Sequence, residues 1–289
     1  MKLTQEQEAV LQTFHIDRLT DSASDSRAIE NFETKERGAN LLAYLQNSNC
    51  ALKDNADLTN AVFFIRDGDG DVLLYFTLKC GSLHRHYSAS ILELADKLEE
   101  YDNLSNLANK GDENAKWALE DRMPVLQEAI NIYNVLKKKG TKFVKKLRSL
   151  LSNRANETNA NNMNVLLSHP GIEMAQFCVN EACKPKYKDL FSPNTIGATV
   201  FWYKIIPFIL TITDCVGLEY LYIFAADNTP NKQLVGYYNT ALCFAEPEDI
   251  GTVRPLYDNN CILMSQKVSD LLENRKRFFD NFNPDGDEA

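Results

Sequence analysis

The stretch FIRDGDGDVLLYF, residues 64–76, places three aspartates and two glycines between two apolar runs. Asp-Gly between β-prone runs is a strong hairpin signal, because glycine readily takes the positive φ of a type I′ turn. A calcium loop is the alternative. Counted from Asp67, however, the sixth and twelfth positions of an EF-hand hold Val72 and Leu78 instead of Gly and Glu. We therefore predict an antiparallel strand pair over 61–80 and no metal site.

The composition bounds the class of protein. The chain has 289 residues, of which 44% are hydrophobic, enough for a sizeable core, and its net charge of -9 argues against a general polyanion binder. The seven cysteines form no CxxC pair and no Cys/His cluster, which favours buried thiols in a reducing compartment. The first residues lack the apolar core of a signal peptide, so we expect a cytoplasmic protein.

The pattern along the chain predicts helices first and an α/β arrangement later. Residues 1–60 read as mostly helical, with 28–45 the clearest amphipathic stretch, and helices are expected over 88–104 and 113–138. Later segments predict a strand over 172–180, a long apolar helix over 196–216, a strand over 219–227, and a short helix within 231–244 that leads into another strand. Charged residues and a proline interrupt 198–226, which we interpret as a buried helix and strand and not as a membrane span: Lys204, Pro207, Asp214 and Glu219.

The segment SPNTIGATVFWYK, residues 192–204, opens the long apolar helix. A loop that starts a helix can present free backbone N–H groups and the positive end of the helix dipole to a phosphate. Gly197 would allow close approach of a ligand, and Thr195 or Thr199 would add a hydroxyl. A lone glycine at a helix start more often serves packing or turn chemistry, so this motif alone is weak.

Taken together, residues 172–244 resemble the GNAT-type acyl-CoA N-acyltransferase superfamily. The family's loop Gln/Arg-x-x-Gly-x-Gly/Ala corresponds to Asn194-Thr-Ile-Gly-Ala-Thr199, with Asn for the first residue and Thr for the last. Its Asn-x-x-Ala-x-x-Phe-Tyr corresponds to Asn231, Leu234, Tyr237 and Tyr238, and its Gly-Phe to Cys243 and Phe244, one residue later than usual. The 61–80 hairpin looks like the family's second and third strands.

The resemblance implies an α/β fold with a mixed, mostly antiparallel central sheet and helices on both faces. Residues 1–84 and 166–275 would form the GNAT-like domain, 85–165 a helical insertion, and 276–289 an acidic, frayed tail. The implied function is transfer of an acetyl group from acetyl-CoA, as cosubstrate, to a primary amine of a small molecule, of a protein Lys or N-terminus, or of an aminoacyl-tRNA.

Acyl transfer to an amine needs a base, an acid for the leaving thiolate and N–H donors for the oxyanion. Glu173 is the candidate base, and a Glu at a strand edge in water is the plain alternative. Tyr238 is the candidate acid with Tyr237 in reserve, and purely structural tyrosines are equally compatible. The resemblance assigns coenzyme A to the backbone of Phe177, Cys178 and Val179, to the loop, and to Asn231, for which helix capping is the alternative. The loop residues are Asn194, Thr195, Ile196, Gly197, Ala198 and Thr199.

Two further features leave alternatives open. His84 and His86 at the end of the hairpin could line an acceptor site or pair on zinc, but no third ligand is apparent, and solvated histidines are the commoner case. The cationic stretch from Lys137 to Arg148 could dock RNA, although it lacks interleaved aromatics and such runs are usually solvated helix faces. The rivals to the transferase are thus a non-catalytic GNAT-like module acting through its insertion and an RNA-interacting protein.

Overall fold

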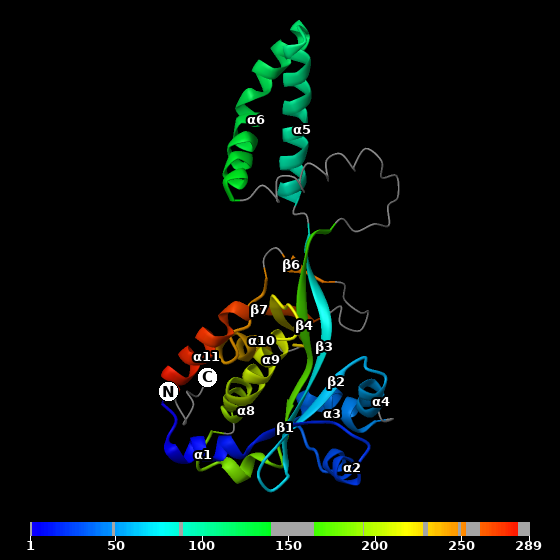
Figure 1. Cartoon of the computed structure of the whole chain (residues 1–289), viewed down its shortest axis with the longest axis vertical. Helices are drawn as coiled ribbons and strands as arrows, with labels where there is room; N and C mark the ends of the chain where they lie inside the picture. Colours follow the sequence, from blue (N-terminus) through cyan, green and yellow to red (C-terminus); the bar gives the residue numbers. More distant parts are fainter. Residues whose placement is uncertain are drawn as a thin grey trace. The chain divides into compact units, whose positions relative to one another are not determined.

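The computed structural model describes residues 2–47, 50–86, 89–139, 165–192, 194–227, 231–247, 250–252 and 261–282. The chain divides into two compact units (Figure 1): Met1–Leu83 together with His169–Ala289, and His84–Ser168. The first unit holds most of the sheet, and the described part of the second contains a pair of helices.

The first unit is built on a seven-stranded sheet in the order β1-β2-β3-β4-β5-β7, with β6 beside β3. The pairs β1–β2, β2–β3 and β5–β7 are antiparallel, and β4–β5 is parallel. The predicted fold class, a mixed and mostly antiparallel sheet with helices on both faces, is therefore confirmed. The strands are β1 (His15–Arg18), β2 (Ala61–Arg66), β3 (Val72–His86), β4 (Val165–Val179), β5 (Tyr220–Ala225), β6 (Ile250–Gly251) and β7 (Ile262–Lys267).

Helices cover the two faces of this sheet unequally (Figure 1). One face, the α8 face, packs the largest core cluster, to which Leu11, Trp202, Tyr238 and Phe279 all belong. The other, the α3 face, packs a smaller cluster around Leu45 and Tyr75. The α8 face carries α1 (Gln5–Thr13), η2 (Lys184–Tyr187), α8 (Ile196–Val200), η3 (Phe201–Ile205), α9 (Ile206–Thr213), α10 (Gln233–Thr240), η5 (Val268–Asp270) and α11 (Leu271–Asp280). The α3 face carries α2 (Ala23–Glu30), η1 (Glu36–Gly38), α3 (Ala39–Gln46) and α4 (Cys50–Ala56).

The predicted apolar helix runs through α8, η3 and α9, with η3 a π-helical turn. Pro207 has no N–H to donate, so a carbonyl one turn earlier needs another partner. The Arg275 Nε donates to the carbonyl of Trp202 at 2.8 Å, and the Trp202 Nε1 donates to the carbonyl of Ala241 at 2.8 Å. By length and composition Ile196–Thr213 would suffice to cross a membrane, but 56% of this window is buried in the protein. It is a core helix here, as predicted.

The Asp-Gly hairpin forms as expected, although its turn is of another type. The Gly70 N–H donates to the carbonyl of Asp67 at 3.0 Å, and the Asp67 N–H to that of Asp71 at 3.0 Å. Of the turn residues only Gly70 has a positive φ, +90°, whereas a type I′ turn needs two. Next to the turn, the register between the two strands shifts: Ile65 pairs with Leu74, whereas the next residue, Arg66, pairs with Val72.

The three aspartates of the turn hold a lysine ammonium. The Nζ of Lys186, from η2, lies 2.6 Å from Asp67, 2.7 Å from Asp69 and 3.0 Å from Asp71. The Tyr187 hydroxyl also donates to Asp67, at 2.5 Å. Burial opposes ionisation of Asp67, but the hydrogen bonds from Lys186 and Tyr187 outweigh it and lower the Asp67 pKa. The cluster of carboxylates thus ties the hairpin to η2.

Cys243 has a φ of +58°, in the left-handed region that glycine occupies most readily. This is the position where the family resemblance expects glycine. The backbone conformation is therefore the one the family's residue would favour, although the side chain differs.

The expectations for the two ends of the chain need correction. Residues 15–18 are a strand that completes one edge of the sheet, not part of a helical region, and 28–45 is divided between α2, η1 and α3. The tail expected from 276 is helical as far as Asp280, because Phe279 is buried in the core. In the described residues directly after α10, 241–247, an isolated bridge between Ala245 and Ser265 takes the place of the expected strand.

In the second unit the described residues include the ends of β3 and β4 and two helices, α5 (Ala89–Asn109) and α6 (Glu113–Lys139), which pack as an antiparallel pair (Figure 1). Both predicted helices are present, and Gly111 turns between them with a φ of +94°. Leu98, Ala115, Leu126 and Ala129 are buried, whereas Trp117 is exposed. The cationic stretch lies outside the described residues beyond Lys139.

Replacing Lys186 by Met should lower the free energy of unfolding by about 1–3 kcal/mol at pH 7, because Asp67 is only 3% exposed and loses its cation. The folded pKa of Asp67 is lowered, so its stabilisation is present above its unfolded pKa of about 3.9 and fades as the pH falls through the folded value. Denaturant melts from pH 2 to 8 should show the difference from wild type shrinking below about pH 4. Lys116→Met, which removes an exposed pair with Glu113, should cost under about 0.5 kcal/mol. Equal costs for both variants would contradict the account.

Replacing Cys243 by Gly should raise the free energy of unfolding by about 0.5–1 kcal/mol, since the left-handed conformation strains any residue with a Cβ. The matched control is Cys215→Gly. Cys215 is also a free cysteine, more exposed than Cys243, and its φ is not positive. Cys215→Gly should lower the free energy of unfolding by about 0.5–1 kcal/mol, because glycine gives the unfolded chain more conformational freedom. Chemical denaturation of both variants checks the signs, and destabilisation by Cys243→Gly would refute the strain.

Candidate functional site

The strands β4 and β5 separate after a short parallel ladder. Gly171, Ile172 and Glu173 pair with Tyr220, Leu221 and Tyr222, and within the described residues β4 makes no pair with β5 beyond Glu173. On its other edge β5 continues its ladder with β7 as far as Ala225. A gap in the hydrogen bonding therefore opens between the last residues of β4 and of β5.

A local irregularity in β4 accompanies this separation. Side chains alternate between the faces of a strand, yet Met174 and Phe177 both belong to the cluster on the α8 face, while Cys178 belongs to that on the α3 face. The alternation thus slips by one residue between Met174 and Phe177, as at a β-bulge. At this point the N–H of Gln176 donates to the hydroxyl of Thr77 on β3 at 3.0 Å, and the Thr77 hydroxyl in turn contacts the Gln176 side-chain oxygen.

Two backbone N–H groups of β4 are directed toward the gap. The amide of Gln176 bonds Thr77, and the amide of Asn180 bonds the carbonyl of Leu73 at 2.8 Å, so both point toward β3. Because successive residues of a strand direct their N–H groups to opposite sides, those of Phe177 and Val179 point the other way. These are residues that the resemblance assigned to the pantetheine arm.

The start of α8 lies against this end of β4. A Cβ built on Gly197 would come within 2.9 Å of Val179 Cγ2 and 3.3 Å of the Tyr237 hydroxyl, so any larger residue would force these side chains to shift. Thr195, the N-cap residue, makes no side-chain capping bond, and Asn194 is exposed. The helix start therefore lies beside the open edge of β4 without a side-chain cap on Thr195, although the N–H of Ile196 already donates to the carbonyl of Ser192 at 3.2 Å.

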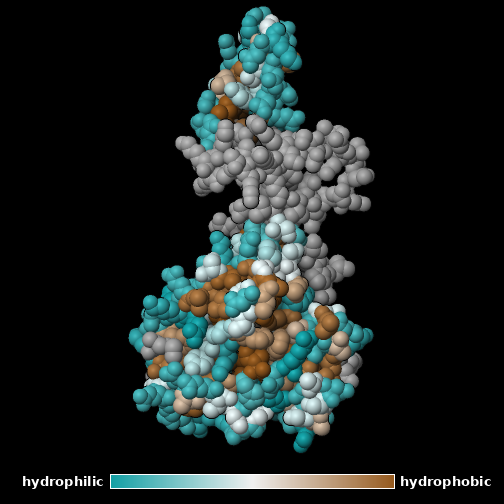
Figure 2. Space-filling model, viewed as in Figure 1, coloured by the Kyte–Doolittle hydropathy of each residue, from teal (hydrophilic) through white to brown (hydrophobic). Residues whose placement is uncertain are grey.

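Two tyrosines of α10 adjoin the same place: the Tyr237 hydroxyl lies next to Gly197, and the Tyr238 ring lies beside that of Tyr237. Burial raises the pKa of both Tyr237 and Tyr238, while the charge of Arg37 acts in the opposite direction on both. The two hydroxyls thus stay protonated at neutral pH and can donate. Arg37 is exposed, and within the described residues no ion pair involves it. Figure 2 shows hydrophobic residues gathered on the face of this unit that carries α9 and α10.

Asn231 does not have the capping role considered for it. The N-cap of α10 is Lys232, with a φ of +47°. The carboxylate of Asp227, just after β5, accepts from the N–H groups of Leu234 and Val235 at 2.7 and 3.0 Å. A carboxylate at a helix start also suits the helix dipole, so Asp227 caps α10 and Asn231 is an exposed residue before it.

A polar strip crosses the α3 face at the fork of β4 and β5. Glu173 is 5% exposed, and its Oε1 lies 3.2 Å from the Nζ of Lys79 on β3. The hydroxyl of Tyr222 on β5 hydrogen-bonds to Glu173, and burial followed by the charge of Glu173 raises the Tyr222 pKa. The Tyr222 ring covers Gly81 and Gly171, where any side chain would collide with it. Glu173 is thus a buried carboxylate with an ammonium and a phenol beside it, not a Glu in open water.

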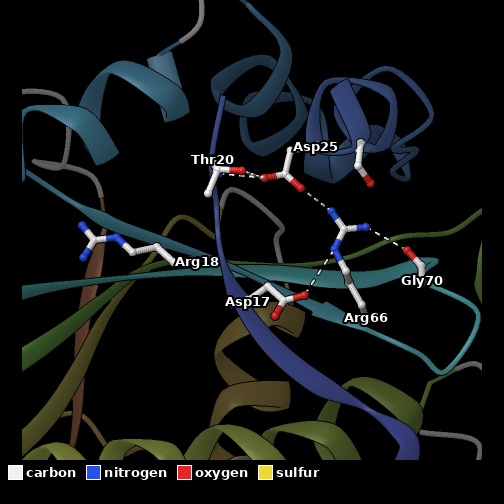
Figure 3. A pocket seen from close by; sticks show the side chains of 7 residues that line it. Asp17, Arg18, Thr20, Asp25, Arg66 and Gly70 are labelled. Atoms are coloured by element: carbon white, nitrogen blue, oxygen red, sulfur yellow. Dashed lines mark hydrogen bonds and ion pairs between the residues drawn. The ribbon is translucent and has the colours of Figure 1, made fainter. Parts of the chain in front are cut away.

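A separate pocket of about 450 Å³ lies between β1, α2 and the hairpin turn (Figure 3). Its charged groups satisfy one another: Arg66 binds Asp25 at 2.6 Å and the carbonyl of Gly70 at 2.8 Å, and Asp25 also accepts from Thr20. Asp17 lies 3.6 Å from Arg66. These contacts join α2 to the sheet. Because the charged groups are paired with one another, the pocket has little unbalanced charge with which to bind a ligand.

The structure thus brings together most of the predicted site residues. The backbone of 177–179, the start of α8 and the two tyrosines converge at the end of β4, while Glu173 lies at the fork. Sequence reasoning missed Lys79, Tyr222, Arg37 and Asp227. A signal existed for the first two, since a lysine and a tyrosine on apolar strands need partners when buried; for Arg37 the sequence offered none.

No family model and no curated protein matches the chain. Among solved structures it is similar to a mutant of the toxin AtaT, with a TM-score of 0.47 and 10% identity over 91% of this chain and 93% of that one. It is similar to AtaTR bound with AcCoA, at 0.47 and 12% over 91% and 98%. A mutant of KacT scores 0.45 with 11% identity over 91% and 99%. Scores below 0.5 at such identities do not assign the chain to a family.

Proposed function

We propose that the protein is an acyl-CoA-dependent N-acyltransferase of the GNAT type, which moves an acetyl group from acetyl-CoA to a primary amine. The observation that carries this proposal is the separation of β4 from β5 after Glu173, with the start of α8 at its open end. A coenzyme needs both features: N–H groups along an extended arm and a helix start for its pyrophosphate.

The distances support the same assignment. From Val179 back to Glu173 an extended strand spans about 20 Å, comparable with the extended pantetheine arm. A pyrophosphate at the start of α8, near Gly197 and Arg37, would then place the thioester near the fork. The N–H groups of Phe177 and Val179 would bond the arm. The fork is where Glu173 and the Tyr222 hydroxyl lie.

The residues would divide the chemistry between them. Glu173 takes a proton from the amine, directly or through water, which general-base catalysis requires within hydrogen-bond reach. Tyr238 remains the proposed donor to the leaving thiolate. Tyr237, the reserve candidate, has its hydroxyl next to Gly197, at the pyrophosphate end of the arm and out of reach of a thiolate at the fork. The seven cysteines are free, which supports the cytoplasm as the place of action.

Acetyl-CoA should stabilise the protein against heat, by about 2.7 kcal/mol at a concentration 100 times its Kd. Arg37→Glu should leave the melting temperature of the free protein unchanged, since Arg37 is exposed, and weaken acetyl-CoA roughly 10–100-fold by removing a charged contact to phosphate. Arg27→Glu, the same charge change on the exposed side of α2, should bind like wild type. Thermal melts with titrated acetyl-CoA measure all three.

No stabilisation of wild type by acetyl-CoA would overturn the proposal. Equal weakening by Arg27→Glu and Arg37→Glu would show only a general charge effect and remove Arg37 from the site. Binding without release of free coenzyme A in the presence of any primary amine would favour the alternative, a non-catalytic GNAT-like binding module.

A further inference from the structure

The side chain that meets the proposed base is itself a primary amine. The Lys79 Nζ lies 3.2 Å from the Glu173 carboxylate, within the reach that proton transfer needs. Both groups are on the α3 face, on the neighbouring strands β3 and β4. The place expected for an acceptor amine is therefore already taken by a residue of the protein.

Lys79 differs from two other ion-paired lysines, Lys186 and Lys116, in its surroundings. Its side chain is 28% exposed, and its carboxylate partner is 6% exposed, so the pair is sheltered and yet open on one side. Lys186 is held by three carboxylates, and although burial opposes its charge, they raise its pKa and keep its amine protonated. Lys116 pairs with Glu113 in water, with both side chains well exposed. Only Lys79, among these three, combines one buried carboxylate with a place at the fork.

We propose that Lys79 is a site of self-acylation, at which the protein transfers the acyl group of acyl-CoA to its own side chain. The proposal rests on the transferase function above. Glu173 takes a proton from the Lys79 ammonium, and the freed nitrogen attacks the thioester carbonyl. A C–N bond forms and the C–S bond breaks as the tetrahedral intermediate collapses. The nitrogen loses its second proton, the thiolate takes one, and the products are the Lys79 amide, coenzyme A and one proton.

Acylation changes the site in a defined way. An amide is neutral, so Glu173 loses its cationic neighbour and keeps the Tyr222 hydroxyl. The position beside the carboxylate then becomes free of charge, and an external cationic amine can pair with Glu173 without displacing the lysine. The acyl group on Lys79 thus governs entry of the acceptor.

The test is to incubate the full chain with acetyl-CoA and map acetylated lysines by peptide mass spectrometry over time. We expect Lys79 to be modified at least ten times faster than Lys116, which is more exposed and reports plain chemical acetylation. Glu173→Gln should reduce the rate at Lys79 at least tenfold and leave the rate at Lys116 unchanged. The melting temperature and acetyl-CoA stabilisation of Glu173→Gln confirm that it remains folded and binds.

Lys79→Arg and Lys79→Gln test the consequence without relying on Glu173. Arg keeps the charge and cannot be acylated, whereas Gln resembles the amide. Gln should therefore release coenzyme A to an external amine faster than Arg does, by several-fold, at equal acetyl-CoA stabilisation. Gly81→Ala, which displaces the Tyr222 ring, should slow acylation of Lys79.

The outcomes separate the two proposals. If acetyl-CoA stabilises the protein but Lys79 is modified no faster than Lys116, or equally in Glu173→Gln, self-acylation is refuted and the transferase stands. If acetyl-CoA gives no stabilisation, the transferase fails, and the self-acylation proposal fails with it.

Discussion

The N–H of Gln176 and the hydroxyl of Thr77 determine the shape of the candidate site. In a regular strand the backbone amide of β4 would bond the backbone of β3, and the alternation of side chains would continue unbroken. Here a buried side-chain hydroxyl takes the bond, which accommodates the extra residue of a bulge. The strand then turns Phe177 to the α8 face, where its ring contacts that of Phe201, and leaves β5.

Separation of two strands has a cost, because backbone groups that face the gap lose their partners. The protein compensates by packing: Val179 lies against Gly197, and the core on the α8 face holds α8 and α10 in place. The groups that remain, namely N–H donors of β4 and an uncapped helix start, are those that an extended ligand with an anionic end requires. This is why one irregularity in β4 links the fold to the proposed chemistry.

Two lysine–carboxylate clusters show how similar chemistry serves different ends. The Lys186 ammonium makes three ion pairs with the aspartates of the hairpin turn. These ion pairs attach the turn to η2 and keep the ammonium charged. Lys79 makes one contact with a buried carboxylate at the fork. A buried ion pair contributes little stability compared with apolar packing, which is consistent with the chemical role proposed for the second pair.

The sequence predicted the elements whose signals are local. The hairpin, β4, the apolar helix, β5 and α10 all followed from periodicity and turn residues, and Cys243 was matched to a glycine that its φ of +58° would favour. Strand β1 was missed because its four residues are too short for a pattern and are held by pairing with β2. The Lys79–Glu173–Tyr222 group could not be predicted, since it depends on the register of three strands, and a shift of one residue would turn each side chain to the other face. Asp227 caps α10 from seven residues upstream of Leu234, a distance at which capping patterns carry no signal.

The most direct test of the central claim is amide hydrogen exchange with and without acetyl-CoA. We predict that acetyl-CoA slows exchange at the amides of Phe177 and Val179 and at the start of α8. The amides of Gln176 and Asn180, which already bond β3, should change little. Protection of the amides of Phe177 and Val179, with those of Gln176 and Asn180 unchanged, would place the coenzyme along the open edge of β4. Unchanged exchange in β4 and α8, or protection confined to another part of the chain, would contradict the account.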